Sequence, residues 1–270
     1  MRAHRSTILT AAMSLAIAGC GGGDGAGDGG GGGDLASKPP KQILADMSAA
    51  LAKVRSYHVE GTEEGRDGRS VLAADVTAAG AAHITVRTAG TRLEILVAGG
   101  QNYMKADRAF WKRQGGTNGA KVAQVLGDRW VVAPPSAAGT FGPLVQRLSP
   151  RTLARCTSRN TGTLTKAGTR TVAGQRAIVI ADKGDRPGGG PGELSIAATG
   201  RALPLRMTQT GPEAPGGKPD PECDPDGTSD TTASDVRFSR FDAPLRISAP
   251  ANALDLGSLQ RGSGSSETTS

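Results

Sequence analysis

Few residues in this chain have the types and spacing that catalysis requires. His58 and His83 lie in alternating, strand-like stretches, without an acidic or cysteine neighbour at the spacing of a metal-ligand set. The sequence also has no G-x-S-x-G elbow, no H-E-x-x-H motif and no S-x-x-K motif with supporting partners. We therefore predict no catalytic residue, no cofactor and no metal centre, and an exported hydrolase ranks last among the functions considered.

Acidic side chains gather late in the chain. They are Asp220, Glu222, Asp224, Asp226 and Asp230, with Gly227 among them. The run imitates the first half of a calcium-binding loop, but position twelve is Ala233, where a bidentate glutamate is required. A solvated acidic loop is the favoured interpretation, and a weak calcium site is the alternative.

The chain begins with the features of a secretory signal peptide. Arg2 and Arg5 precede an apolar run over residues 8–18, which is too short to span a bilayer of about 30 Å. Cys20 follows directly after Ile-Ala-Gly and resembles the lipobox cysteine of bacterial lipoproteins. This resemblance implies cleavage before Cys20, diacylglycerol on that residue, and a location at the outer face of the bacterial plasma membrane. Ordinary secretion, with a stray cysteine near the cleavage site, is the alternative.

The other two cysteines are predicted to form a disulfide. Once Cys20 carries lipid, Cys156 and Cys223 remain in an oxidising compartment, where two free cysteines pair. Metal binding by two cysteines without a nearby histidine is a poor alternative.

The composition is that of a globular chain with an excess of glycine. Of 270 residues, 37% are hydrophobic, 21% are charged and 3% are aromatic, and 40 are glycine. The formal charge of +7 falls to +5 when Arg2 and Arg5 leave with the signal peptide. Such a charge favours anionic surfaces, which for an exported protein are lipid headgroups or cell-wall polymers. No stretch interleaves Lys and Arg with aromatic residues, so we expect no nucleic-acid partner.

We expect the chain to consist of four consecutive parts. Residues 1–19 are the signal peptide, 20–37 the lipidated cysteine and a flexible Gly-rich tether, 38–256 a single domain, and 257–270 a disordered polar tail. The tether formally contains G-x-G-x-x-G, but no strand precedes it and no helix follows, so the match is compositional.

Apolar periodicity predicts a helix and then two groups of strands. Apolar residues three and four apart predict a helix over Pro40–Arg55. The first strands are predicted over residues 57–62, 71–77, 82–88, 92–97 and 101–105. Short helices follow within 118–130 and 144–156, and further strands over 161–166, 175–181, 193–198, 203–210, 235–241 and 245–248. Regular spacing with tight turns is typical of an antiparallel meander.

Four arginines recur at intervals of four near the second predicted helical region. They are Arg147, Arg151, Arg155 and Arg159. On a helix this spacing makes a basic ridge, for which an ordinary solvated face is the favoured interpretation. A docking site for another envelope protein is the alternative.

Several short motifs follow the first predicted helix in a definite order. They are Ser56-Tyr57-His58-Val59-Glu60-Gly61-Thr62, Tyr103-Met104-Lys105, Phe110-Trp111-Lys112, Leu126-Gly127-Asp128-Arg129-Trp130, Phe238-Ser239-Arg240-Phe241-Asp242 and Ile247-Ser248-Ala249-Pro250. This order resembles the actinobacterial LolA-like lipoproteins, in particular the LppX/LprG group. The resemblance covers roughly residues 40–256, and the lipobox agrees with it.

The resemblance implies an α+β fold in which a curved antiparallel sheet forms an incomplete half-barrel. The N-terminal helix and a short helical insertion would pack on its concave side around an apolar cavity. Better-known members carry lipids or lipidated molecules through the envelope. An acyl ligand would then contact Ile43, Leu44, Met47, Leu51, Ile84, Val86, Ile95 and Val97, although the same residues would serve a closed core. We therefore expect a lipid-binding lipoprotein, with a sensor or scaffold that binds an envelope protein as the alternative.

Overall fold

The computed structural model describes residues 35–66, 68–133, 142, 144–159, 161–218, 220, 222–223 and 231–255. All of these belong to the unit Gly32–Ser270, and Met1–Gly31 form a separate unit. Cys20, the signal peptide, most of the tether and the polar tail lie outside the described residues. Leu35–Ser37, at the end of the predicted tether, form the 3-10 turn η1, in which the side chain of Leu35 is buried.

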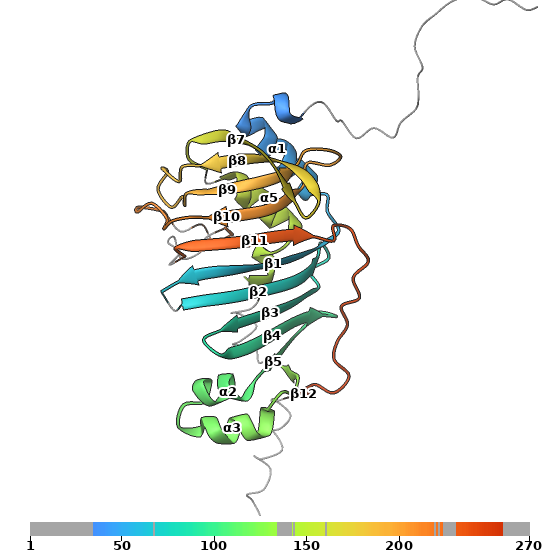
Figure 1. The fold of residues 1–270 in the computed structure, drawn as a ribbon. Coiled ribbons are helices and arrows are strands. Elements are labelled where there is room, and N and C mark those ends of the chain that lie inside the picture. The colour runs from blue at the N-terminus through green and yellow to red at the C-terminus, as the bar shows by residue number, and fades with distance from the viewer. Residues whose placement is uncertain are drawn as a thin grey trace, which may run out of the picture. The chain divides into compact units, whose positions relative to one another are not determined.

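One large open sheet organises the described residues (Figure 1). Its strands are β1 (Ser56–Gly65), β2 (Gly68–Thr77), β3 (Ala82–Thr88), β4 (Thr91–Ala98), β5 (Gln101–Ala106), β6 (Val131–Val132), β7 (Leu164–Val172), β8 (Gln175–Asp182), β9 (Gly192–Ala197), β10 (Pro204–Gln209), β11 (Ala233–Ser239) and β12 (Leu254–Asp255). Their order is β12-β6-β5-β4-β3-β2-β1-β11-β10-β9-β8-β7. Neighbours are antiparallel except β12 and β6, so the predicted α+β class with an unclosed antiparallel sheet is confirmed.

The helices gather at two places beside the sheet. They are α1 (Pro40–Leu51), α2 (Arg108–Gln114), the 3-10 turn η2 (Gly116–Asn118), α3 (Gly119–Leu126) and α5 (Pro150–Arg159). In Figure 1, α1 and α5 lie against the end of the sheet that contains β7–β10, and α2 and α3 lie beyond β5. Within the described residues, no helix combines the length and the apolar character that crossing a membrane requires.

Two predicted elements are corrected by the structure. The helix predicted over Pro40–Arg55 ends at Leu51, because the chain must turn before β1 begins at Ser56. Residues 245–248 form no strand; Ile247 instead packs its side chain against the buried Leu96 and Tyr103. In addition, α2 lies where no helix is predicted.

The face of the sheet that packs against the helices, here called the inner face, carries two apolar clusters. The first joins β1–β5 to α2, α3 and the segment before α5, through residues that include Tyr57, Val59, Ile84, Ile95, Trp111, Leu126 and Val145. The second joins α1 to β8 and β9, through Leu35, Ile43, Leu44, Met47, Ile178, Ile180, Leu194 and Ile196. Burial of these side chains is the main stabilising contribution to the fold, at roughly 25 cal/mol per Å² of apolar surface.

Tyr57 connects the sheet to the segment that leads into α5. Its ring is fully buried and packs near Phe238 and Phe241, with ring centroids 6.1 and 6.2 Å away. Its hydroxyl donates a hydrogen bond to the carbonyl oxygen of Leu148. Burial raises the pKa of Tyr57 far above its ordinary value, so the phenol remains a neutral donor.

Side-chain hydrogen bonds then set the position of α5. The hydroxyl of Ser149, the residue before the helix, accepts a hydrogen bond of 3.3 Å from the N–H of Thr152, which is the interaction of a helix N-cap. The hydroxyl of Ser48 on α1 donates to the carbonyl oxygen of Ala154 on α5 at 2.7 Å. The two helices therefore lie close together over the inner face.

Candidate functional site

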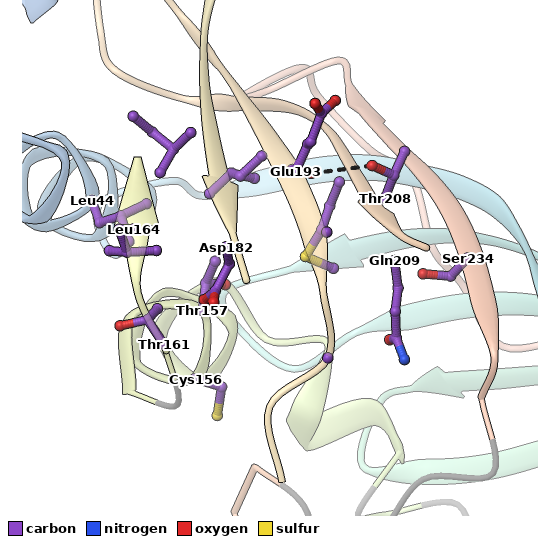
Figure 2. Close-up of a pocket in the computed structure, with 15 residues that line it drawn as sticks. Leu44, Cys156, Thr157, Thr161, Leu164, Asp182, Glu193, Thr208, Gln209 and Ser234 are labelled. Atoms are coloured by element: carbon purple, nitrogen blue, oxygen red, sulfur yellow. Dashed lines mark hydrogen bonds between the residues drawn. The ribbon is translucent and has the colours of Figure 1, made fainter. Parts of the chain in front are cut away.

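A pocket of about 190 Å³ lies between α1, α5 and the inner face of the second half of the sheet. It is lined by Leu44, Cys156, Thr157, Thr161, Leu164, Ile180, Asp182, Gly190, Gly192, Glu193, Leu194, Met207, Thr208, Gln209 and Ser234. Figure 2 shows Leu44 and Leu164 beside each other at one side, and Gln209 and Ser234 at the other. The lining therefore combines one helix residue of α1 with strands that are distant from it in sequence.

The apolar part of the lining comes from neighbouring strands. Ile180 of β8 and Leu194 of β9 are directly paired across the sheet, and Leu194 is paired with Met207 of β10. Leu164 at the start of β7 and Leu44 of α1 complete this set. Leu44, Ile180 and Leu194 are buried, whereas Leu164 and Met207 are half-buried and present apolar surface to the pocket.

Polar groups border the same pocket. The carboxylate of Asp182 accepts hydrogen bonds from the N–H groups of Gly162 at 3.1 Å and Gly184 at 2.8 Å. The side-chain amide of Gln209 donates to the carbonyl oxygens of Gly211 at 2.9 Å and Thr231 at 3.0 Å. These hydrogen bonds hold the surrounding loops in place and make this border of the pocket polar.

A disulfide joins α5 to the loop beside the pocket. Cys156 lines the pocket and forms the predicted disulfide with Cys223, with a Cα–Cα distance of 5.4 Å. Arg155 and Arg159 lie on either side of Cys156 and pair with Glu222 at 2.7 Å and Asp220 at 3.0 Å. The acidic loop is thus bound to α5 by one covalent link and two ion pairs.

The two ion pairs join residues of the predicted basic ridge to residues of the acidic run. Arg155 and Arg159 are already paired within the chain, and Arg147 lies before the N-terminus of α5. Asp224, Asp226 and Asp230 lie outside the described residues, so the calcium alternative is not addressed there. Within the described residues, no three His, Cys, Asp or Glu side chains are grouped so that they could hold a metal ion.

The sequence-predicted lining residues are divided between the two apolar clusters. Ile43, Leu44 and Met47 belong to the cluster of β8 and β9, and Leu51, Ile84 and Ile95 to the cluster of β1–β5. Val86 and Val97 are half-buried against the latter. Of the eight, Leu44 lines the 190 Å³ pocket; ligand contact by the other seven stays a prediction. The pocket residues Leu164, Ile180, Leu194 and Met207 were not predicted, although their alternation within predicted strands was a usable signal.

The two histidines lie on the opposite, outer face of the sheet. His58 Nδ1 is 2.9 Å from Asp75 Oδ1, and His83 Nε2 is 3.1 Å from Glu94 Oε2. Both acidic partners come from neighbouring strands, in cross-strand positions that sequence spacing alone does not reveal. Each histidine therefore has a structural carboxylate partner, away from the pocket.

Comparisons with known proteins agree with this architecture. No model of a known protein family matches the sequence, and no curated protein sequence is similar to it. Among solved structures, LprF from Mycobacterium bovis aligns with a TM-score of 0.51 at 20% identity, over 79% of this chain and 97% of that chain. The chain therefore shares the fold of LprF.

Two other solved structures align more loosely with this chain. The lipoprotein LppX from Mycobacterium tuberculosis has a TM-score of 0.46 at 15% identity, over 77% of this chain and 97% of that chain. The LolA superfamily protein NE2245 from Nitrosomonas europaea has a TM-score of 0.25 at 10% identity, over 79% and 96% of the two chains. Of these three structures, LprF is the one whose alignment shows a shared fold.

Proposed function

We propose that this chain is an exported, membrane-anchored lipoprotein that binds an acyl chain of a lipid between α1, α5 and the sheet. The observation that carries the proposal is the lining of the pocket, where Leu44, Leu164 and Met207 form an apolar surface bordered by polar groups. An acyl chain would remove this surface from water, and each buried CH₂ contributes about 0.8 kcal/mol. A headgroup would remain near Asp182 and Gln209.

The volume of the pocket limits how much of a lipid it accommodates. Its volume of about 190 Å³ is close to that of an apolar cavity of roughly 150 Å³ that binds benzene. It is smaller than typical ligand sites, which measure roughly 300–1,000 Å³. The proposal is therefore restricted to part of one acyl chain. Admission of a longer chain requires α1 and α5 to separate from β7–β10.

The proposed anchor and the LolA-like fold support the same function. A lipidated Cys20 followed by a Gly-rich tether would keep the domain near the outer face of the plasma membrane. A domain held there meets lipid at high local concentration, so even a partial acyl site would be occupied. The better-known lipoproteins that the sequence resembles carry lipids, which favours a lipid cargo over a catalytic role.

A pair of matched substitutions tests the position of the cargo. Leu164→Trp fills the pocket, and we expect it to weaken the binding of a fluorescent fatty acid by about tenfold, or about 1.4 kcal/mol. Leu93→Trp is the control, because Leu93 is also half-buried on the inner face but lies on β4, away from the pocket. Fluorescence titration of the full chain measures both affinities, and thermal unfolding verifies that both variants fold.

The same pair distinguishes the pocket from the site predicted from sequence. If Leu93→Trp abolishes binding and Leu164→Trp does not, the cargo lies against β3 and β4, near Ile84 and Ile95, and the proposed pocket is wrong. A second outcome concerns the lipid function itself. If the wild-type chain does not bind fatty acids, and mass spectrometry finds no lipid extracted from the purified protein, the lipid function is wrong. The protein-partner alternative would then be examined by crosslinking in intact cells.

A further inference from the structure

A second hollow, of about 640 Å³, lies beside the outer face of the sheet. It is formed by the β7–β8 turn, the β9–β10 connection and the ends of β10 and β11. Its arginine side chains are Arg201, Arg206, Arg237 and Arg240, and its apolar side chains include Val172, Ala197 and Leu205. We call this hollow the arginine groove.

The charges that line the arginine groove are strongly unbalanced. Its lining contains four arginines, and Glu60 is the acidic residue among them. Arg206 is engaged by Asp235, which accepts hydrogen bonds of 2.7 and 2.8 Å, and Arg201 pairs with Asp242. These two guanidinium groups are therefore largely neutralised by the chain itself.

The other two arginines remain available. Arg237 is exposed and makes no ion pair or side-chain hydrogen bond with any described residue. Arg240 approaches Asp75 at 3.5 Å and leaves 54% of its side chain exposed. A guanidinium has five N–H donors. Both side chains therefore retain N–H groups that could donate hydrogen bonds to a bound anion.

The register of the sheet places like charges next to each other in the groove. Arg206 of β10 and Arg237 of β11 are directly opposite in the antiparallel ladder. Like charges in this position are destabilising, by an amount comparable to the roughly 0.2–1 kcal/mol that a favourable cross-strand pair contributes. On its other side Arg237 lies opposite Glu60 of β1, but Glu60 lies 3.8 Å from His58 and Asp235 is hydrogen-bonded to Arg206, so neither carboxylate forms an ion pair with Arg237. An anion in the groove would give the Arg237 guanidinium such a partner.

An apolar wall adjoins these charges. Val172, Ala197 and Leu205 are buried and, with Ala177, form an apolar cluster separate from the two clusters of the inner face. The groove volume lies within the roughly 300–1,000 Å³ of ligand sites. An apolar wall beside free guanidinium groups matches a ligand that is both anionic and apolar, rather than a fully hydrated ion.

We propose that the arginine groove binds the phosphate headgroup of an anionic amphiphile, such as a phospholipid. Arg237 and Arg240 donate charge-assisted hydrogen bonds to the phosphate oxygens. The wall formed by Val172, Ala197 and Leu205 contacts the glycerol and the first methylene groups. The site is separate from the pocket between α1, α5 and the sheet, and it does not require that the pocket bind an acyl chain.

Short-chain lipids below their micelle concentration test this proposal by isothermal titration calorimetry. The protein is the full chain with Cys20→Ser, so that it carries no acyl group, and the probes are dihexanoyl phosphatidylglycerol, dihexanoyl phosphatidylcholine and inorganic phosphate. We expect phosphatidylglycerol to bind more tightly than either other probe, since it alone combines a net negative charge with an apolar part. Equal binding of phosphatidylcholine, or equal binding of inorganic phosphate, would overturn the proposal.

Charge-matched variants locate the site. Arg237→Gln/Arg240→Gln should weaken phosphatidylglycerol binding by about tenfold or more, because it removes two charge-assisted contacts. Arg87→Gln/Arg108→Gln removes the same charge from exposed positions on β3 and α2, outside the groove, and should change the affinity less than about twofold. An equal loss in both double variants would show a general charge effect and overturn the assignment.

The pocket variant separates the two proposals. Leu164→Trp should weaken fatty-acid binding by about tenfold, and it should weaken phosphatidylglycerol binding much less than Arg237→Gln/Arg240→Gln does. If instead Leu164→Trp abolishes phosphatidylglycerol binding and the arginine double variant does not, the headgroup site in the groove is wrong and the pocket is the lipid site.

Discussion

At the scale of single residues, Glu94 has a different environment from the other acidic groups of the outer face. Its side chain is 8% exposed and lies 3.1 Å from His83, 3.1 Å from Arg92 and 3.4 Å from Lys105. Burial by itself would raise the pKa of Glu94, but the hydrogen bond with His83 and the charges of Lys105 and Arg92 outweigh it and lower the pKa below its ordinary value. The carboxylate is therefore a stabilising anion in the folded state.

The lowered pKa predicts how the contribution of Glu94 depends on pH. A carboxyl with a lower pKa in the folded state contributes stability that is fully present above its unfolded pKa of about 4.3 and is lost as pH falls through the folded value. We expect Glu94→Gln to lower the free energy of unfolding by about 2 kcal/mol at pH 7, because it leaves Arg92 and Lys105 without their anion. In urea unfolding, the difference in the free energy of unfolding between Glu94→Gln and wild type should be smaller at pH 3 than at pH 7. An equal difference at both pH values would contradict this account.

At the scale of elements, alternation predicted most strands but could not identify their partners. Strand β3 has the predicted bounds Ala82–Thr88, since its apolar residues face one side of the sheet in regular order. Residues 245–248 also alternate, yet Ile247 contributes a side chain to the outer-face cluster of Leu96 without backbone pairing. Alternation of apolar and polar residues indicates which side chains are buried. It does not distinguish a strand from an extended segment, because side chains are buried in both.

The helix α2, which is not predicted, has a local signal in the residue that precedes it. The carboxylate of Asp107 accepts a hydrogen bond of 2.8 Å from the N–H of Phe110, which is a helix N-cap. Trp111 on this helix donates from its indole nitrogen to the carbonyl oxygens of Ala106 and Gly127, both at 3.0 Å. The aspartate that precedes this stretch therefore marks the start of a helix.

The disulfide is the covalent link between α5 and the acidic loop, so its loss should be measurable. It joins residues separated by 67 positions, for which loop entropy predicts a contribution of about 4 kcal/mol. We expect Cys156→Ser/Cys223→Ser to lower the free energy of unfolding by roughly 2–4 kcal/mol in denaturant titration. Because Cys156 lines the pocket, fatty-acid affinity should also fall. A reductant should lower wild-type stability and leave the variant unchanged; an effect of equal size on both would argue against the disulfide as the cause.

At the scale of the whole molecule, the proposed anchor and the folded domain are separate requirements for the proposed lipid function at the membrane. The anchor depends on Cys20, outside the described residues, and the domain on the sheet and helices between Leu35 and Asp255. An anchored domain without a cargo would be a scaffold, whereas a cargo site without an anchor would belong to a secreted carrier. The two must therefore be tested independently.

Metabolic labelling tests the anchor in intact cells. An alkyne-bearing palmitate analogue should label the wild-type chain and should not label Cys20→Ala, because the thiol of Cys20 is the proposed site of lipid attachment. The control is Cys156→Ser/Cys223→Ser, which removes the other two cysteines and should keep the label. Labelling that persists in Cys20→Ala would contradict the anchor and favour ordinary secretion.

The sequence by itself determined the first helix, most of the strands, the choice of disulfide partners and the α+β class, because these depend on local periodicity and on the number of cysteines. The tertiary structure decided which strands meet α1. The pairing of β1 with β11 places β8–β10, rather than β3 and β4, beside Leu44, so the pocket lies in the second half of the sheet. Apolar alternation is identical on a strand that lines a pocket and on one that fills a core. Only the strand order and the position of the helices distinguish the two.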